Sequence, residues 1–437
     1  MTAAIEPGTV KRALSAHAAI GLIAGALLYL VSLSGTVAVF YQELQRLEQP
    51  DAPEMDAISA EAVQRGVEAV LASEAAQSTT THLYVHLPVE ELPRATITTD
   101  AQAVHLDRDG NVAGPEEIAW SDFLVKLHYT LNLPSLVGIT VVGILGVMML
   151  VLSMSGVVAL PRIFRDSFRL RARDGSGVGL TDWHNRLSVW TLPFSVAIAL
   201  TGALIGLATV TAYAIATVDL DGDVEAVYAP IFGAEGEADP TPAPAPNVAA
   251  ALTHMAREYP DVLVTYAILH NPLTRGQHVQ IVGEHERRLI FGEYYGFDAN
   301  GAFMHTAGLA DGELGQQVAA STYQLHFGTF GGIWVKLAYV VFGLALTAIS
   351  ATGVYIWLGK RRRRGVDEPV LRGAWNGIIV GAPVALMFTF LARLGWGNDF
   401  PFAFSFWIIC LAVPCIGAAT AWLTNRRVAP GALAAAE

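Results

Sequence analysis

Two histidines stand near the start of long uncharged runs with the same spacing to a small dipeptide. His17 is followed after 18 residues by Gly35, in Ser34-Gly35, and His184 is followed after 18 residues by Gly202, in Thr201-Gly202. An ionisable side chain at the edge of an apolar run is costly and is therefore a candidate for function. The repeated spacing predicts a duplicated helical unit.

Two further histidines repeat the pattern with a longer offset. His128 lies 28 residues before Gly156, in Ser155-Gly156, and His326 lies 27 residues before Gly353, in Thr352-Gly353. One interfacial histidine alone is often only an amphipathic anchor, but four in matching positions favour a common role. The glycine dipeptides would let a helix or a flat macrocycle approach the backbone closely, and they equally suit ordinary packing of small residues between helices.

The elements that carry these histidines are predicted to be membrane-spanning helices. The chain has 437 residues, of which 53% are hydrophobic, and its mean hydropathy of +0.43 is high for a soluble protein. Uncharged runs long enough to cross a bilayer, about 20 residues, predict six spans, at 13–40, 133–160, 187–218, 337–359, 374–392 and 402–424. The first run is too long for a signal peptide and has no clear cleavage site, so we expect it to remain as a helix.

The distribution of Lys and Arg predicts the orientation. Basic residues concentrate in the N-terminal tail, in the connections 161–186 and 360–373, and in the C-terminal tail 425–437. The positive-inside rule makes this side cytoplasmic, with both termini. The other two loops are acidic, with 16 Asp/Glu against 5 Lys/Arg in 41–131 and 15 against 4 in 219–325. They contain no cysteine, which excludes a disulfide framework or a thiolate metal site there.

The two acidic loops are predicted to be external α+β modules of the same design. In the first, a helix at 56–75 precedes strand-like runs at 81–87, 94–99 and 103–114; in the second, a Pro/Ala linker at 239–246 and a helix at 247–258 precede runs at 262–269, 276–283 and 287–298. We expect a helix and a three-stranded hairpin sheet in each. Asp107 to Gly110 and Asp298 to Gly301 are predicted to close hairpins, because the other ligands of a calcium loop are missing.

The predicted organisation is a mainly α integral membrane protein in which span, module and span occur twice, followed by an extra hairpin. The segments are a tail and first span (1–40), external module 1 (41–131), second span (132–160), basic loop (161–186), third span (187–218), external module 2 (219–325), fourth span (326–359), basic loop (360–373), a two-span hairpin (374–424) and a cytoplasmic tail (425–437).

The predicted topology pairs the four histidines by side of the membrane. His17 and His184 fall on the cytoplasmic side, and His128 and His326 on the external side. Structural zinc needs four protein ligands, whereas haem brings four equatorial nitrogens and needs only two axial histidines. The sequence therefore predicts two bis-histidine haem b groups.

Cationic side chains near the histidines are candidates to pair with haem propionates. Arg12, Arg186 and Lys126 lie close to a histidine in sequence, and Lys336 lies ten residues past His326. For Lys336 the alternative is that its stem snorkels to the membrane interface.

The motifs around these residues resemble those of a known family. They are His17 with Ser34-Gly35, Leu127-His128, Trp183-His184-Asn185-Arg186 with Leu200-Thr201-Gly202, Leu325-His326-Phe327-Gly328 with the segment from Thr352 to Trp357, and the hairpins at 104–112 and 296–305. Over about residues 1–365 the chain is similar to the PepSY-associated transmembrane family of iron-regulated membrane proteins, which includes bacterial inner-membrane ferric-siderophore reductases. The resemblance implies a four-helix core with two haems, periplasmic PepSY-like modules and the bacterial inner membrane. The hairpin at 374–424 departs from the family pattern.

The expected function is transmembrane electron transfer, as a haem-dependent ferric-siderophore reductase. Electrons would pass from the cytoplasmic or membrane side to a periplasmic ferric siderophore or other ferric chelate, and the acidic modules would favour a cationic complex. The donor would be a quinol in the lipid bilayer or a cytosolic reductase, because the cytoplasmic connections are too short for a nucleotide-binding domain; no nucleic acid is expected. Histidines in the modules could touch metal but are interpreted as surface residues; they are His82, His86, His270, His278, His285 and His305.

Two other functions remain open at this stage. The chain could be a non-enzymatic, membrane-anchored regulator whose PepSY-like modules bind an external partner. It could also be a transporter, because duplicated spans are common in that class. Against transport, the predicted spans contain no acidic residue.

Overall fold

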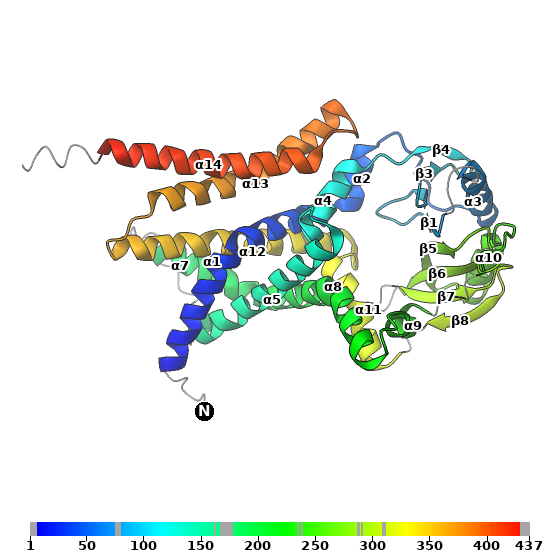
Figure 1. Ribbon diagram of the computed structural model, residues 1–437, viewed down its shortest axis with the longest axis horizontal. Helices are drawn as coiled ribbons and strands as arrows, with labels where there is room; N and C mark the ends of the chain where they lie inside the picture. The colour runs from blue at the N-terminus through cyan, green and yellow to red at the C-terminus, as the bar shows by residue number, and fades with distance from the viewer. Residues whose placement is uncertain are drawn as a thin grey trace, which may run out of the picture. The chain divides into compact units, whose positions relative to one another are not determined.

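The computed structural model describes residues 7–74, 80–160, 163–166, 178–233, 236, 239–285, 289, 292–307 and 312–428. They form two compact units (Figure 1). The helical unit comprises Met1–Val39, Ala119–Leu207 and Gly331–Glu437, and the sheet unit comprises Phe40–Ile118 and Ala208–Phe330. Within the basic loop (161–186), residues 161–162 and 167–177 lie outside the described residues.

Six helices are long and apolar enough to cross a membrane, which confirms the predicted number. They are α1 (Pro7–Ala38), α5 (Ser135–Ala159), α8 (Leu192–Asp219), α12 (Gly332–Arg363), α13 (Pro369–Trp396) and α14 (Phe402–Val428). Their apolar windows carry at most two charged residues. All backbone N–H and C=O groups of such a segment can pair within the helix, as a bilayer requires.

Short helices precede two of the spans in the helical unit. These are α4 (Ala119–Thr130) and α7 (Val178–Trp190); a third, α6 (Ile163–Asp166), follows α5. The predicted third span began at 187, but the helix breaks after Trp190 because Pro193, in the first turn of α8, has no N–H to continue the ladder. His128 and His184 therefore lie on α4 and α7 rather than on the spans, whereas His17 lies within α1.

The helical unit is held together through small residues. α1 packs against both α5 and α12, and a Cβ added to Gly343 on α12 would collide with Thr36 on α1. A Cβ on Gly143 of α5 would lie 2.8 Å from the backbone of Gly206 on α8. Close backbone approach of this kind replaces the hydrophobic drive that is absent between helices in lipid.

The hairpin of α13 and α14 is fixed to the other helices by polar side chains. The Tyr29 hydroxyl on α1 donates to the carbonyl of Ile379 at 2.9 Å, and the indole N–H of Trp375 on α13 donates to the carbonyl of Ala351 at 3.2 Å. On α4, the indole of Trp120 donates to the hydroxyl of Thr389 at 3.0 Å. The two spans outside the expected four-helix core are thus an integral part of the helical unit.

The sheet unit contains one eight-stranded antiparallel sheet in the order β4-β3-β2-β1-β5-β6-β7-β8. The strands are β1 (His82–His86), β2 (Ala95–Thr98), β3 (Ala103–Leu106), β4 (Val112–Pro115), β5 (Val262–His270), β6 (His278–His285), β7 (Glu293–Phe297) and β8 (Phe303–Ala307). Each half has four strands, and the expectation of three was wrong. The outermost strands β4 and β8 are largely exposed, so their sequences lack the apolar alternation that marks a strand.

The two halves meet at β1 and β5 around a local two-fold relation. Val85 pairs with Ile97 in the first half, Ala267 pairs with Ile281 in the second, and Val85 and Ala267 face each other. The two acidic segments therefore share one sheet, rather than each closing its own. Both D-x-x-G hairpins are closed in the same way, with the carboxylates of Asp107 and Asp298 accepting two backbone N–H bonds each.

Helices α3 (Ala60–Glu74) and α10 (Val248–Glu258) pack side by side and bury one face of this sheet. Their apolar residues, including Val67 and Met255, join Leu83, Ile97 and Phe297 in a single core. The remaining helices of the sheet unit are α2 (Tyr41–Glu48), α9 (Glu225–Phe232) and α11 (Leu314–Phe327).

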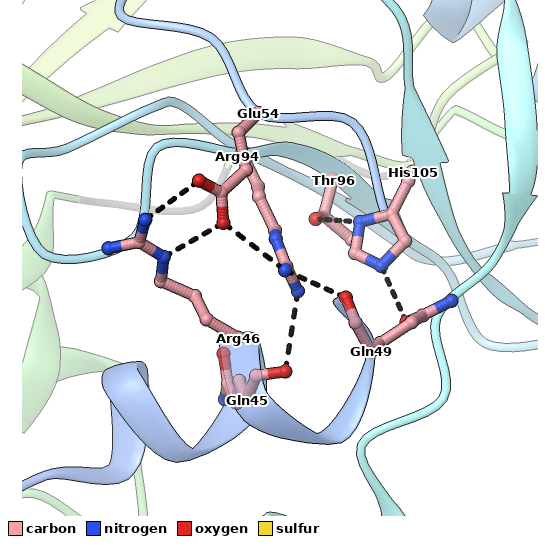
Figure 2. A network of polar contacts seen from close by, with 7 residues as sticks. All are labelled: Gln45, Arg46, Gln49, Glu54, Arg94, Thr96 and His105. Carbon is pink, nitrogen blue, oxygen red and sulfur yellow. Dashed lines mark hydrogen bonds and ion pairs between the residues drawn. The ribbon is translucent and has the colours of Figure 1, made fainter. Parts of the chain in front are cut away.

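A polar network ties α2 to the sheet (Figure 2). Arg94, only 2% exposed, donates to the backbone carbonyl of Gln49 at 2.8 Å and contacts Glu54 at 3.3 Å. Both ring nitrogens of His105 are engaged: Nε2 lies 2.9 Å from Oε1 of Gln49, and Nδ1 lies 3.1 Å from the hydroxyl of Thr96. His105 is a structural histidine that anchors the end of α2.

Candidate functional site

His17, on α1, is docked against α5. Its Nδ1 lies 3.1 Å from the carbonyl oxygen of Leu152 and 3.1 Å from the hydroxyl of Ser155. A Cβ added to Gly156 would lie 3.4 Å from Cε1 of the ring. Because a carbonyl oxygen can only accept, the bond to Leu152 assigns the ring proton to Nδ1.

His128, at the end of α4, is docked against α1 in the same manner. Its Nδ1 lies 3.0 Å from the carbonyl oxygen of Val31. A Cβ on Gly35 would lie 2.5 Å from Cε1 and 2.8 Å from Nδ1, so no residue other than glycine fits here. The absence of a Cβ at Gly35 is therefore what lets this ring reach the helix backbone.

His184, on α7, repeats the contact against α12. Its Nδ1 lies 2.9 Å from the hydroxyl of Thr352, and the imidazole also bonds to the backbone of Ile349. The Thr352 hydroxyl already donates to the carbonyl of Ala348, so it accepts the Nδ1 proton. A Cβ on Gly353 would lie 3.6 Å from Cε1 of His184, an ordinary contact distance.

The three contacts share one geometry. In each, the carbonyl that meets the imidazole belongs to the residue four positions before the glycine: Val31 before Gly35, Leu152 before Gly156, Ile349 before Gly353. Fixing the proton on Nδ1 leaves Nε2 as the basic nitrogen, which is the usual preparation of a histidine for a metal.

Gly35 thus has a role that the sequence did not specify, because the absence of a Cβ there admits a histidine from a neighbouring helix. Within the described residues, no hydrogen bond reaches Nε2 of His17.

His17 and His184 lie within electrostatic range of each other in the helical unit. Burial, with smaller contributions from the charges of His17 and Lys360, lowers the pKa of His184 to about 4. Both rings lie within electrostatic range of Lys360. In the sequence this lysine is only one residue of a basic loop, because it lies far along the chain from His17 and His184.

His326 lies near the end of α11, in the sheet unit, with its ring centroid 5.9 Å from that of Phe327. Its pairing with His128 stays a prediction, and so does any role of Gly202.

The four cationic candidates have different environments. Arg12 is exposed, and Lys126 is exposed and pairs with Asp122 at 3.6 Å. Arg186 is buried, with its guanidinium 5.6 Å from the ring centroid of Trp183 and 5.4 Å from that of Trp190. Lys336, in α12, is only 2% exposed.

Three histidines of the sheet unit form a row that the sequence did not predict. His82, His270 and His278 are register neighbours on β1, β5 and β6, with ring centroids 5.0 Å and 4.3 Å apart. Burial and the two neighbouring rings lower the pKa of His270 to about 3.

Two further histidines of the sheet unit lie apart from this row. His86 packs against Tyr266, and His305 lies against Gly296; the side chain of His285 lies outside the described residues. In the part of the chain that the structure describes, no group of three or more His, Cys, Asp or Glu side chains is arranged to hold a metal ion.

Comparison with known proteins agrees with the arrangement of spans. An uncharacterized protein of Pseudomonas aeruginosa is 26% identical over 290 residues, which cover 61% of this chain and 71% of the relative. The model of the family described as the PepSY-associated TM region matches residues 14–360, from the start of α1 to near the end of α12. The match includes all three docked histidines and ends before α13. The chain therefore belongs to the PepSY-associated TM region family.

Proposed function

We propose that this protein is a di-haem transmembrane electron-transfer protein that reduces a periplasmic ferric complex, most simply a ferric siderophore. Haem b, when bound, would supply one-electron chemistry and a path for electrons through the bilayer. His17 and His184 would hold one group, and His128 and His326 the other.

The observation that carries the proposal is the shared docking of three imidazoles. A buried histidine that donates its Nδ1 proton within the protein keeps Nε2 as the basic nitrogen, which is the one able to bind a metal. Here the Nδ1 proton of His17, His128 and His184 is donated to a neighbouring helix. Two histidines from different helices, His17 and His184, lie within electrostatic range of each other. This donor set fits two axial ligands and is too small for a four-ligand structural zinc site.

The cationic residues near this pair would hold haem propionates. Arg186 is buried between two tryptophans that restrict its guanidinium, and Lys360 acts electrostatically on both rings. A pre-ordered guanidinium loses little entropy on binding a carboxylate. Lys336, on α12, is also a buried cation and would bind the propionates of the haem held by His128 and His326.

The acidic segments support a cationic acceptor on the external side. Residues 41–131 and 219–325 together carry 31 Asp/Glu (16 and 15) against 9 Lys/Arg (5 and 4). Such a surface attracts cations and repels anions. Reduction of iron to the ferrous state weakens its hold by hard oxygen ligands, so iron would be released.

The visible spectrum of the detergent-purified protein tests the proposal. We expect a Soret band and about two haems b per chain after haem-replete expression, and bis-histidine spectra in the reduced state. His128→Ala should remove one haem, leave the other and abolish reduction of a ferric hydroxamate by dithionite-reduced protein, measured with a ferrous chelator. His82→Ala, in the sheet, is the matched control and should retain both haems.

A protein without a Soret band would contradict the proposal and leave the membrane-anchored regulator as the better interpretation. Loss of both haems or of neither in His128→Ala would contradict the pairing of the histidines.

A further inference from the structure

A cavity of about 390 Å³ lies between α4 and the start of α14 in the helical unit. Its lining includes the aromatic residues Phe123, Phe402 and Phe404 and the polar residues Asp122, Lys126 and Asn132. The volume is within the range of small-molecule sites, roughly 300–1,000 Å³. Three of its nine lining residues, Phe402, Ala403 and Phe404, lie on α14, beyond the residues matched by the family model.

The polar side of the cavity is built by an unusual helix end. Leu131 and Asn132 both have a φ of 55°, in the left-handed region, where leucine is rare. The backbone N–H of Asn132 closes the end of α4 on the carbonyl of Lys126 at 3.3 Å. Oδ1 of Asn132 is buried and accepts no hydrogen bond from the described residues. Backbone strain and an unmet acceptor beside a cavity are both expected of a binding site.

The lining selects a flat ring with two hydroxyl or carbonyl groups. Phe404 is 68% exposed and offers its ring, beside the buried pair Phe123 and Phe402, whose centroids lie 6.2 Å apart; aromatic rings stack offset or edge-on against another planar ring. Asp122 and Asn132 can accept hydrogen bonds, and Lys126 can donate one. A phosphate headgroup is disfavoured, because Asp122 lies 3.6 Å from the one cation, Lys126.

The location favours a ring with a lipid tail. The cavity lies at the ends of membrane-spanning helices, and Phe404, on α14, is 68% exposed on an apolar helix. A tail could leave the cavity along this face. Lys126 is two residues before His128 on α4, so a bound ring would lie near a predicted haem ligand.

We infer that this cavity binds the headgroup of a membrane quinone, and that its quinol form is an electron donor. Two O–H bonds of the quinol would break, giving quinone, two electrons and two protons. The electrons would leave one at a time and reduce two equivalents of the ferric complex. The Asp122 carboxylate accepts one proton and water the other. The binding of quinone is independent of the proposed function, and only the electron transfer rests on it.

Photolabelling of the full-length protein in lipid nanodiscs tests the binding. We expect an azidoquinone to label peptides that contain residues 119–132 or 401–404, and excess decylubiquinone to suppress the labelling. Asp122→Asn and Asn132→Gly should each weaken this suppression about tenfold. Glycine keeps the left-handed backbone at position 132, so only the amide is lost.

The matched controls are Asp367→Asn, in the exposed loop before α13, and Asn271→Gly, another left-handed asparagine, with a φ of 46°, in the sheet unit. Both should behave as the wild type. Labelling spread along the lipid-facing helices, or equal suppression by decanol, would overturn the inference, as would unchanged suppression in both cavity variants.

A second measurement separates the inference from the proposed function. If dithionite reduces bound haem but decylubiquinol neither binds nor reduces it, the inference fails and the proposed function stands. If the protein has no haem but still binds decylubiquinone in the cavity, the proposed function fails and the binding site stands.

Discussion

His105 of the sheet unit and the docked histidines of the helical unit hold their ring protons on opposite nitrogens. His105 satisfies both: Nε2 donates to the amide oxygen of Gln49, and Nδ1 accepts from the hydroxyl of Thr96. His17 and His128 instead donate from Nδ1 to a helix carbonyl. The tautomers are therefore reversed between the two units.

The difference separates a histidine that holds a fold from one that is prepared for a ligand. His105 cannot bind a metal without losing a buried hydrogen bond. The ring of His17 or His184 could bind through Nε2 and keep its present bonds. The proton position, rather than burial, is what distinguishes them, because all of these rings are at least partly buried.

The largest effect is expected from Gly35→Ala, which attacks the docking of His128. The new Cβ would lie 2.5 Å from Cε1 of the ring, so the imidazole must leave the carbonyl of Val31. We expect loss of the haem that His128 would hold, seen as about half the haem per chain, and a packing cost of about 1–3 kcal/mol.

Gly353→Ala is the control for this variant, because its Cβ would lie 3.6 Å from Cε1 of His184. Both substitutions raise helix propensity equally, by about 1 kcal/mol, so a difference between them reports on the histidine. Equal haem content in the two variants would show that docking on the glycine does not position the ligand.

A smaller effect is expected from the pH dependence that His105 gives the sheet unit. Burial, with a contribution from the charge of Arg94, lowers the pKa of His105 from 6.5 to about 4. The unfolded chain therefore binds a proton below pH 6.5 that the folded sheet refuses until about pH 4. The stabilising contribution is complete above pH 6.5 and is lost as the pH falls through this window, by at most about 1.4 kcal/mol per pH unit.

Hydrogen exchange of β2 and β3 at pH 7.5 and pH 5 measures this loss. His105→Gln cannot titrate and should show a shallower dependence on pH than the wild type, although it is less protected at pH 7.5. Parallel profiles for the two proteins would contradict the assignment to His105.

The spans could be predicted from the sequence because a bilayer imposes length and hydropathy on each segment independently. Contacts between segments could not. The sequence associated each histidine with the glycine that follows it, His17 with Gly35 and His128 with Gly156. The structure exchanges them, so that His17 meets Gly156 and His128 meets Gly35.

Two other features were hidden for different physical reasons. Strands β4 and β8 lie at the exposed edges of the sheet, where no face needs apolar residues. The cavity beside α4 is completed by α14, which is remote in sequence from Asn132 and carries no motif that would associate the two.

The smallest effect is expected from Lys360, whose charge acts on both His17 and His184. Ferric haem carries one more positive charge than ferrous haem, so a nearby cation favours reduction. Lys360→Gln should lower the midpoint potential of the haem at this pair, by less than about 59 mV, the equivalent of a tenfold change for one electron. The shift is small because the side chain is exposed and screened by solvent, and it should shrink further in high salt. Arg364→Gln, an exposed cation of the same basic loop, should leave the potential unchanged. A potentiometric titration that finds the same shift in both variants would indicate a general effect of surface charge, and only a shift confined to Lys360→Gln would tie the reducible group to His17 and His184.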